Sequence, residues 1–195
     1  MNKIEQVCVY CGSSTQADES YYETARLLGG LLSESEIELI YGGGDVGVMG
    51  AISDAVLDSK GKVTGVIPKF MVDQGWCNRR VENMLVVETM HERKAKMAEL
   101  SQGVIALPGG CGTLEELLEI ITWKQLGIYL HPIVILNVNN YFDPLLTQFK
   151  QALDANFMRP MHQHMWSVAS NPKEAIAQLL TTPLWDKDVR KLAQL

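Results

Sequence analysis

The sequence lacks the features that mark membrane proteins and general nucleic-acid-binding proteins. No apolar run reaches the roughly 20 residues that a helix needs to span a bilayer. The 17 lysines and arginines are outnumbered by 23 aspartates and glutamates, which gives a net charge of −6. Proteins that bind nucleic acid without sequence preference rely on a basic surface instead. We therefore expect neither a membrane nor a nucleic acid as partner, and a small molecule as ligand.

Cysteine is scarce, and the N-terminal residues do not resemble a secretion signal. The opening stretch MNKIEQVCVYCGSS has no separate basic region, apolar segment and cleavage site. Cys8 and Cys11 form a Cys-x-x-Cys pair, but both lie along a predicted strand and no second pair completes a set of four zinc ligands. Few thiols in such positions are typical of a reducing compartment. We predict a cytoplasmic protein without a metal site.

Two nucleotide-binding motifs are missing or incomplete. The motif GxxxxGK[ST] is absent, which argues against magnesium-dependent ATP hydrolysis. The stretch 42–50 satisfies GxGxxG, but the strand predicted at 63–67 ends in Pro68-Lys69, without the acidic residue that binds the ribose of NAD. A mononucleotide is therefore favoured over NAD, no cofactor is expected, and Gly43 and Gly44 are predicted to contact the ligand.

Hydrophobic segments of strand and helix type alternate along the whole chain. The predicted strands lie at 7–10, 37–41, 63–67, 85–87, 103–107, 132–137 and 166–169. The predicted helices lie at 21–32, 90–100, 113–126, 141–155 and 172–180, with one more that follows the glycine stretch 42–50 and ends at about 57. The segment 69–83 is predicted to be irregular, either a mobile flap or a specificity loop. Such alternation indicates a single α/β domain over residues 1–195, a doubly wound, Rossmann-like, mostly parallel sheet with helices on both faces.

The stretch 107–116, LPGGCGTLEE, joins a buried strand to an amphipathic helix through three glycines. Bare backbone at Gly109, Gly110 and Gly112 can bring N–H groups and a helix N-terminus close to an anion, as a phosphate site requires. Thr113-x-x-Glu116 also fits a capping box, which would explain the same residues without any ligand. The sequence leaves both interpretations open.

Two further places carry candidate ligand-binding residues. The first strand ends in Gly12 and Ser13, at the edge where open α/β sheets bind ligands. Arg93 and Lys94 are adjacent cations near the start of a predicted helix, where they oppose the helix dipole. A compensating anion nearby is therefore expected.

Three motifs in this order, GGGDVGVMG at 42–50, MHERK at 90–94 and PGGCGTLEE at 108–116, resemble those of the Lonely Guy family of cytokinin riboside 5′-monophosphate phosphoribohydrolases. The resemblance covers roughly residues 7 to 140, and similar bacterial proteins also cleave AMP. It implies that Arg93 and Glu116 form the catalytic pair. It also implies the following substrate-binding residues: Gly12, Ser13, Gly43, Gly44, Met90, Lys94, Pro108, Gly109, Gly110, Cys111, Gly112, Thr113 and Thr122. Cys111 stands where Tyr is common in the family.

The function predicted from the sequence is hydrolysis of the N-glycosidic bond of purine nucleoside 5′-monophosphates, of the cytokinin type or AMP. The products would be the free base and ribose 5-phosphate. The alternative is a non-catalytic nucleotide-binding or sensing module that keeps the glycine loops. A homodimer is expected, because the helices predicted at 90–100 and 113–126 carry more apolar surface than one sheet face covers, and because short family members are dimers.

Overall fold

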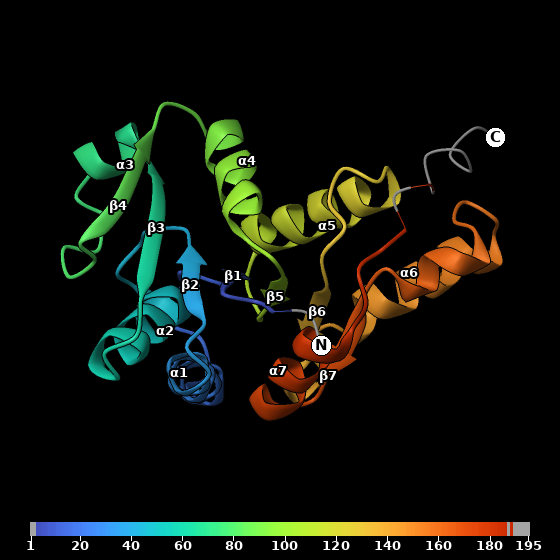
Figure 1. Ribbon diagram of the computed structural model, residues 1–195, viewed down its shortest axis with the longest axis horizontal. Helices are drawn as coiled ribbons and strands as arrows, with labels where there is room; N and C mark the ends of the chain where they lie inside the picture. The colour runs from blue at the N-terminus through green and yellow to red at the C-terminus, as the bar shows by residue number, and fades with distance from the viewer. Residues whose placement is uncertain (1–2, 187, 189–195) are drawn as a thin grey trace.

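A parallel sheet of seven strands forms the centre of the computed structural model, which describes residues 3–186 and 188 (Figure 1). The strands are β1 Gln6–Tyr10, β2 Glu38–Tyr41, β3 Val63–Pro68, β4 Asn83–Val87, β5 Val104–Ala106, β6 Ile133–Leu136 and β7 Ser167–Ala169. Their order in the sheet is β4-β3-β2-β1-β5-β6-β7, and every neighbouring pair is parallel.

The winding direction of the chain reverses at β1. The chain first adds β2, β3 and β4 on one side of β1 and then returns to add β5, β6 and β7 on the other. Cys8 of β1 therefore pairs with Ile40 of β2 on one edge and with Val104 of β5 on the other. In open α/β sheets the crevice beyond the carboxyl ends of the strands at such a reversal is the usual ligand site.

Helices cover both faces of the sheet (Figure 1). They are α1 Glu19–Glu34, α2 Gly47–Asp58, the short α3 Lys69–Asp73, α4 Met90–Leu100, α5 Cys111–Gln125, α6 Asp143–Asp154 and α7 Pro172–Thr181. Residues of α1, α2 and α7 share one hydrophobic cluster with the sheet, whereas residues of α4, α5 and α6 share the other.

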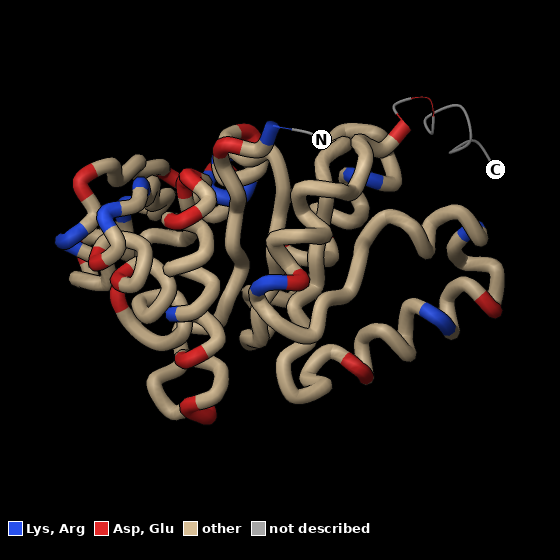
Figure 2. Tube along the Cα trace, turned by 60° about the horizontal axis from the view of Figure 1, so that its bottom comes forward, with Lys and Arg blue, Asp and Glu red and all other residues tan. Residues whose placement is uncertain are grey.

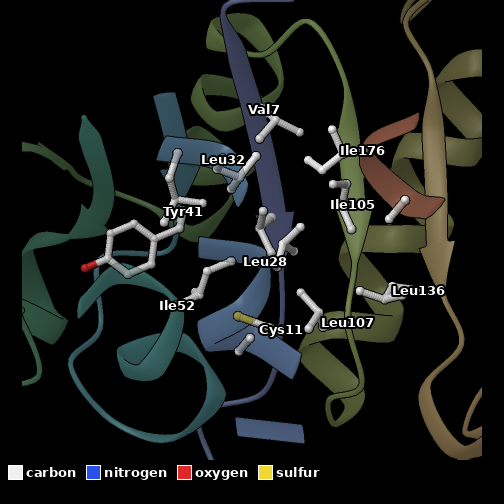
Figure 3. Packing of buried hydrophobic residues seen from close by; sticks show 14 of the residues in the cluster. Val7, Cys11, Leu28, Leu32, Tyr41, Ile52, Ile105, Leu107, Leu136 and Ile176 are labelled. Carbon is white, nitrogen blue, oxygen red and sulfur yellow. The ribbon is translucent and has the colours of Figure 1, made fainter. Parts of the chain in front are cut away.

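Alternate side chains of each strand enter the two clusters. Val7 of β1 lies in the same cluster as Leu28 and Leu32 of α1 and Ile52 of α2 (Figure 3), whereas Cys8 belongs to the opposite cluster. This alternation is the two-residue period of a strand, and because both faces are covered the strands consist of almost continuous apolar residues. The sheet is thus held from both sides, and its carboxyl edge is a fixed platform for the loops that follow.

The predicted fold class is confirmed, and each predicted strand and helix is present, most of them with ends shifted by a few residues. The prediction for 69–83 was wrong in part, because the segment begins with α3 and Cys77 makes an antiparallel bridge with Gly44.

Basic and acidic residues are interspersed along the trace (Figure 2). Among the described residues, no helix has the length and apolar character needed to cross a membrane.

Candidate active site

Arg93 and Glu116 lie side by side at the carboxyl edge of the sheet. The Nη1 atom of Arg93 is 3.8 Å from Oε1 of Glu116, and the two side chains are only 7% and 10% exposed. Arg93 comes from the first turn of α4, which Thr89 caps by accepting a hydrogen bond from the Glu92 N–H at 3.1 Å. Glu116 comes from the second turn of α5. Two helices that follow different strands thus bring a buried cation and a buried carboxylate together.

Backbone carbonyls hold the guanidinium of Arg93 in place. Its Nε donates to the Val66 carbonyl at 3.1 Å, and its Nη2 donates to the Gly42 carbonyl at 3.2 Å. Val66 lies in β3 and Gly42 directly follows β2, so the ends of two strands fix the planar group. The remaining nitrogen, Nη1, is the one that faces Glu116.

The carboxyl group of Glu116 has a pKa raised to about 7. Burial is the main cause, and the nearby positive charge of Arg93 opposes it. Within residues 3–186 and 188, no hydrogen bond fixes this carboxylate. A carboxyl group with a pKa near neutrality and no hydrogen bond that holds it is suited to accept or give a proton at physiological pH.

The N-terminus of α5 is open. Gly110 occupies the N-cap position, and no side chain caps the helix. Thr113 lies inside the first turn, so the interpretation of Thr113 and Glu116 as a capping box was wrong. The first N–H groups of a helix have no partner within the helix. At α5 they are therefore free to bind an anion such as phosphate.

The loops that follow β1 and β5 touch at glycines. The Gly12 N–H donates to the Pro108 carbonyl at 3.1 Å, and a β-carbon at Gly12 would stand 3.1 Å from Cα of Gly109. At Gly109 a β-carbon would stand 2.1 Å from Oγ1 of Thr113. The absence of side chains at both positions therefore allows the two loops to close on each other.

A pocket of about 420 Å³ contains the Arg93–Glu116 pair. It is lined by Cys11, Gly12, Ser13, Gly44, Val46, Met49, Met71, Trp76, Met90, Arg93, Gly110, Gly112, Thr113, Glu115 and Glu116. The lining thus combines polar side chains and bare glycine backbone with apolar side chains. The sequence did not predict Met49, Met71 and Trp76 as lining residues, although Met49 lies within the GGGDVGVMG motif.

A second hollow of about 400 Å³ lies beside the first and shares Gly12, Ser13 and Gly110 with it. Its other lining residues are Ser14, Ala17, Tyr21, Val48, Pro108, Gly109 and Tyr141. An anion bound at the α5 N-terminus would lie beside these shared residues, at the place where the two hollows meet.

The segment that carries Trp76 is anchored to the rest of the molecule. The buried Asn78 donates its backbone N–H to the Gly43 carbonyl at 2.9 Å and its side-chain amide to Ser53 at 3.1 Å. Arg80 forms ion pairs with Asp54 and Asp58 of α2. These bonds make the segment a wall of the pocket and argue against an unattached flap.

Four of the predicted substrate-binding residues lie elsewhere. Lys94 is buried and forms ion pairs with Glu115 and Glu119, which supply the anion expected near this cation. Thr122 is exposed, and its hydroxyl donates to the Leu118 carbonyl at 2.8 Å. Neither residue lines either hollow.

The remaining two are Gly43 and Cys111. Gly43 forms a turn with a positive φ of 78°, and a β-carbon there would stand 2.9 Å from Cβ of Ile67. Glycine is therefore required at this position by the backbone conformation and by the close packing against Ile67. Cys111 is exposed at the first residue of α5. The other predicted residues all line one or both hollows.

Comparison with known proteins gives concordant results. A family model described as possible lysine decarboxylase matches residues 49–179. The cytokinin riboside 5′-monophosphate phosphoribohydrolase LOG7 of Arabidopsis thaliana is 46% identical over 91% of this chain and 82% of its own length. The probable cytokinin riboside 5′-monophosphate phosphoribohydrolase LOGL2 of Oryza sativa subsp. japonica is 44% identical over 98% of this chain and 79% of its own. Among solved structures, the molybdenum cofactor carrier protein of Chlamydomonas reinhardtii shares the fold, with a TM-score of 0.69, 23% identity, and coverage of 91% of this chain and 99% of its own.

Proposed function

The chain belongs to the Lonely Guy family, whose model carries the description possible lysine decarboxylase, and on this premise we propose that it hydrolyses purine nucleoside 5′-monophosphates. The bond between C1′ of the ribose and the base nitrogen breaks, water adds to C1′, and the products are free base and ribose 5-phosphate. AMP and N6-substituted AMP are the proposed substrates.

The buried Arg93–Glu116 pair beside an uncapped helix N-terminus is the observation that carries this proposal. The substrate phosphate binds the N–H groups at the start of α5, which places the ribose toward Glu116. Glu116 then takes a proton from the water that adds to C1′ and stabilises the positive charge that develops on the ribose. The proton passes to the base nitrogen as the C1′–N bond breaks. Arg93 favours the ionised form of Glu116 and orients the nucleotide.

The lining residues do not support the decarboxylase description of the family model. Pyridoxal-dependent decarboxylation requires a lysine that forms a Schiff base with the cofactor. No lysine is among the described residues that line the two hollows, and Lys94 is bound to Glu115 and Glu119. The residues present therefore fit glycosidic hydrolysis better.

A direct assay tests the proposal. Purified protein is incubated with AMP and with isopentenyladenosine monophosphate, and free base is measured by chromatography, with Glu116→Gln as the matched inactive variant. Release of base by the wild type and its loss in the variant are the expected result. Tight binding of AMP without base release by the wild type would instead support the nucleotide-sensing alternative.

We also propose that the protein is a homodimer whose subunits meet at the outer face of α5. Leu118, Thr122 and Leu126 are spaced four residues apart and so lie on one stripe of the helix. Leu118 and Leu126 are 41% and 43% exposed, and Ile128 just beyond the helix is 60% exposed. A second copy on this stripe would cover these side chains. It would also place Thr122 at the interface.

A further inference from the structure

Tyr141 is bound to the glycine loop from outside the catalytic pair. Its hydroxyl donates to the Gly109 carbonyl at 2.6 Å, which links the loop after β6 to the loop after β5. Tyr141 lines the second hollow together with Gly109 and Gly110. None of the sequence motifs included this residue.

The segment before Tyr141 has an unusual backbone that sets the position of the ring. Asn139 and Asn140 both have positive φ, 51° and 59°, a conformation that costs energy for any residue except glycine and is least unfavourable for Asn. The side chain of Asn139 donates to the Ser20 hydroxyl at 2.8 Å, and the residue after Tyr141, Phe142, is buried in the core. Backbone strain of this kind, held by surrounding contacts, is frequent at functional sites.

The bond to Gly109 determines where the next N–H group points. In a planar trans peptide the carbonyl of one residue and the N–H of the next point in opposite directions. Glycine on both sides leaves the peptide between Gly109 and Gly110 free of the β-carbon clashes that would otherwise restrict its rotation. By binding the carbonyl, Tyr141 fixes the Gly110 N–H on the opposite side, away from its own ring.

The Gly110 N–H is a donor at the N-cap of α5, next to the site proposed for the substrate phosphate. Within residues 3–186 and 188, no acceptor is recorded for it. We propose that Tyr141 is a positioning residue, which holds the 109–110 peptide in the orientation that presents the Gly110 N–H to the 5′-phosphate. This inference rests on the proposed function only in naming the phosphate of a nucleoside monophosphate as the ligand.

The test compares Tyr141→Phe with Tyr22→Phe. Tyr22 is a suitable control because its hydroxyl also donates to a backbone carbonyl, that of Ser14 at 2.7 Å, while Tyr22 lines neither hollow. Binding of AMP, inorganic phosphate and adenosine is measured by calorimetry, so that the result does not depend on turnover. Melting temperatures of both variants are recorded alongside.

Tyr141→Phe should weaken the binding of AMP and of inorganic phosphate by about three- to tenfold, the size of one net hydrogen bond. It should leave the binding of adenosine unchanged, and Tyr22→Phe should leave all three unchanged. Equal weakening of AMP and adenosine, or equal effects of the two substitutions, would overturn the proposal and assign Tyr141 a structural role. Because the readout is binding, a wild-type protein that binds AMP but releases no base would refute the hydrolase proposal and leave this one standing.

Discussion

Gly42 leaves the space that the guanidinium of Arg93 fills. A β-carbon at position 42 would stand 1.8 Å from Nη2 of Arg93, the nitrogen that donates to the Gly42 carbonyl. The first glycine of the GGGDVGVMG motif is therefore required by a side chain from α4. Its neighbour Gly43 is required instead by the positive φ of the turn.

Gly42→Ala is expected to displace Arg93 and to lower kcat/KM on the order of 10²-fold, because misplacing a catalytic group by about 1 Å has effects of this size. Gly30→Ala is the matched control. Gly30 lies in α1, where a β-carbon would meet nothing within 4 Å, so this change should preserve activity and stabilise the protein by about 0.5–1 kcal/mol. Steady-state kinetics and thermal melts of both variants test the prediction, which equal activities would contradict.

Glu116→Gln should retain AMP binding and lose turnover by roughly 10²–10⁴-fold, the usual contribution of a positioned proton-transfer group. Binding is measured by calorimetry and turnover by base release. Base release at the wild-type rate would show that another group activates the water.

The activity should depend on the ionisation of Glu116. Its pKa is raised to about 7, so a base at this position loses its function as pH falls below neutrality. We expect kcat/KM to decrease about tenfold per pH unit on the acid side and to level off on the alkaline side. Arg93→Ala removes a charge that lowers this pKa and should move the acid limb to higher pH. A pH profile that is flat through neutrality would exclude Glu116 as the base.

The same pKa predicts how stability varies with pH. The folded state holds the Glu116 proton more tightly than the unfolded chain, whose glutamate pKa is near 4.5. The contribution of this group is therefore fully present below about pH 4.5 and is lost as pH rises through about 7. Glu116→Gln should consequently melt at a higher temperature than the wild type above neutral pH. A difference in melting temperature between the two proteins that does not change with pH would contradict this assignment.

Gly110→Val tests the phosphate site without disturbing the fold. A β-carbon at Gly110 would meet nothing within 4 Å, and its φ of −82° is accessible to any residue. The added side chain would instead occupy the space that an anion needs at the α5 N-terminus. AMP binding should weaken while the melting temperature and adenosine binding stay the same, and equal effects on both ligands would contradict a phosphate site there.

Ile128→Asp is expected to convert the proposed dimer to a monomer, because it places a charge on the face that a second copy would cover. Leu27→Asp is the matched control, since Leu27 is similarly exposed, 63% against 60%, but lies on α1 on the other side of the sheet. Light scattering distinguishes the two masses. A wild-type protein that is monomeric and fully active at working concentration would rule out the dimer.

The sequence predicted the sheet well because the strands are short, continuous apolar runs bounded by glycine, proline or polar residues. The predicted start of α5, at residue 113, was too late. The helix begins at Cys111, within the glycine-rich stretch that resembles a loop in the sequence. The amphipathic pattern of the same helix also did not predict that Leu118 is exposed while Lys124 is buried. Local spacing does not determine which face of a helix a neighbouring element covers.

Contacts between distant segments explain why other parts of the candidate site could not be predicted from the sequence. Lys94 was expected at the ligand because the motif places it next to Arg93, yet adjacent residues on a helix point in different directions. The closeness of Gly42 to Arg93 depends on how α4 crosses the ends of β2 and β3, and Tyr141 reaches the loop through a strained turn that no motif describes. The cytoplasmic location and the single domain over residues 1–195 stay predictions.

The position of β1 also determines when the site can form during synthesis. The strands β1 to β4 are synthesised first and are neighbours in the sheet, but one edge of β1 has no neighbour until β5 at Val104–Ala106 has left the ribosome. A nascent chain that stalls before this point would expose an apolar, unpaired strand edge, which favours aggregation. Arg93 would by then be present without Glu116. The Arg93–Glu116 pair can therefore form only after the strand that closes this edge has been made.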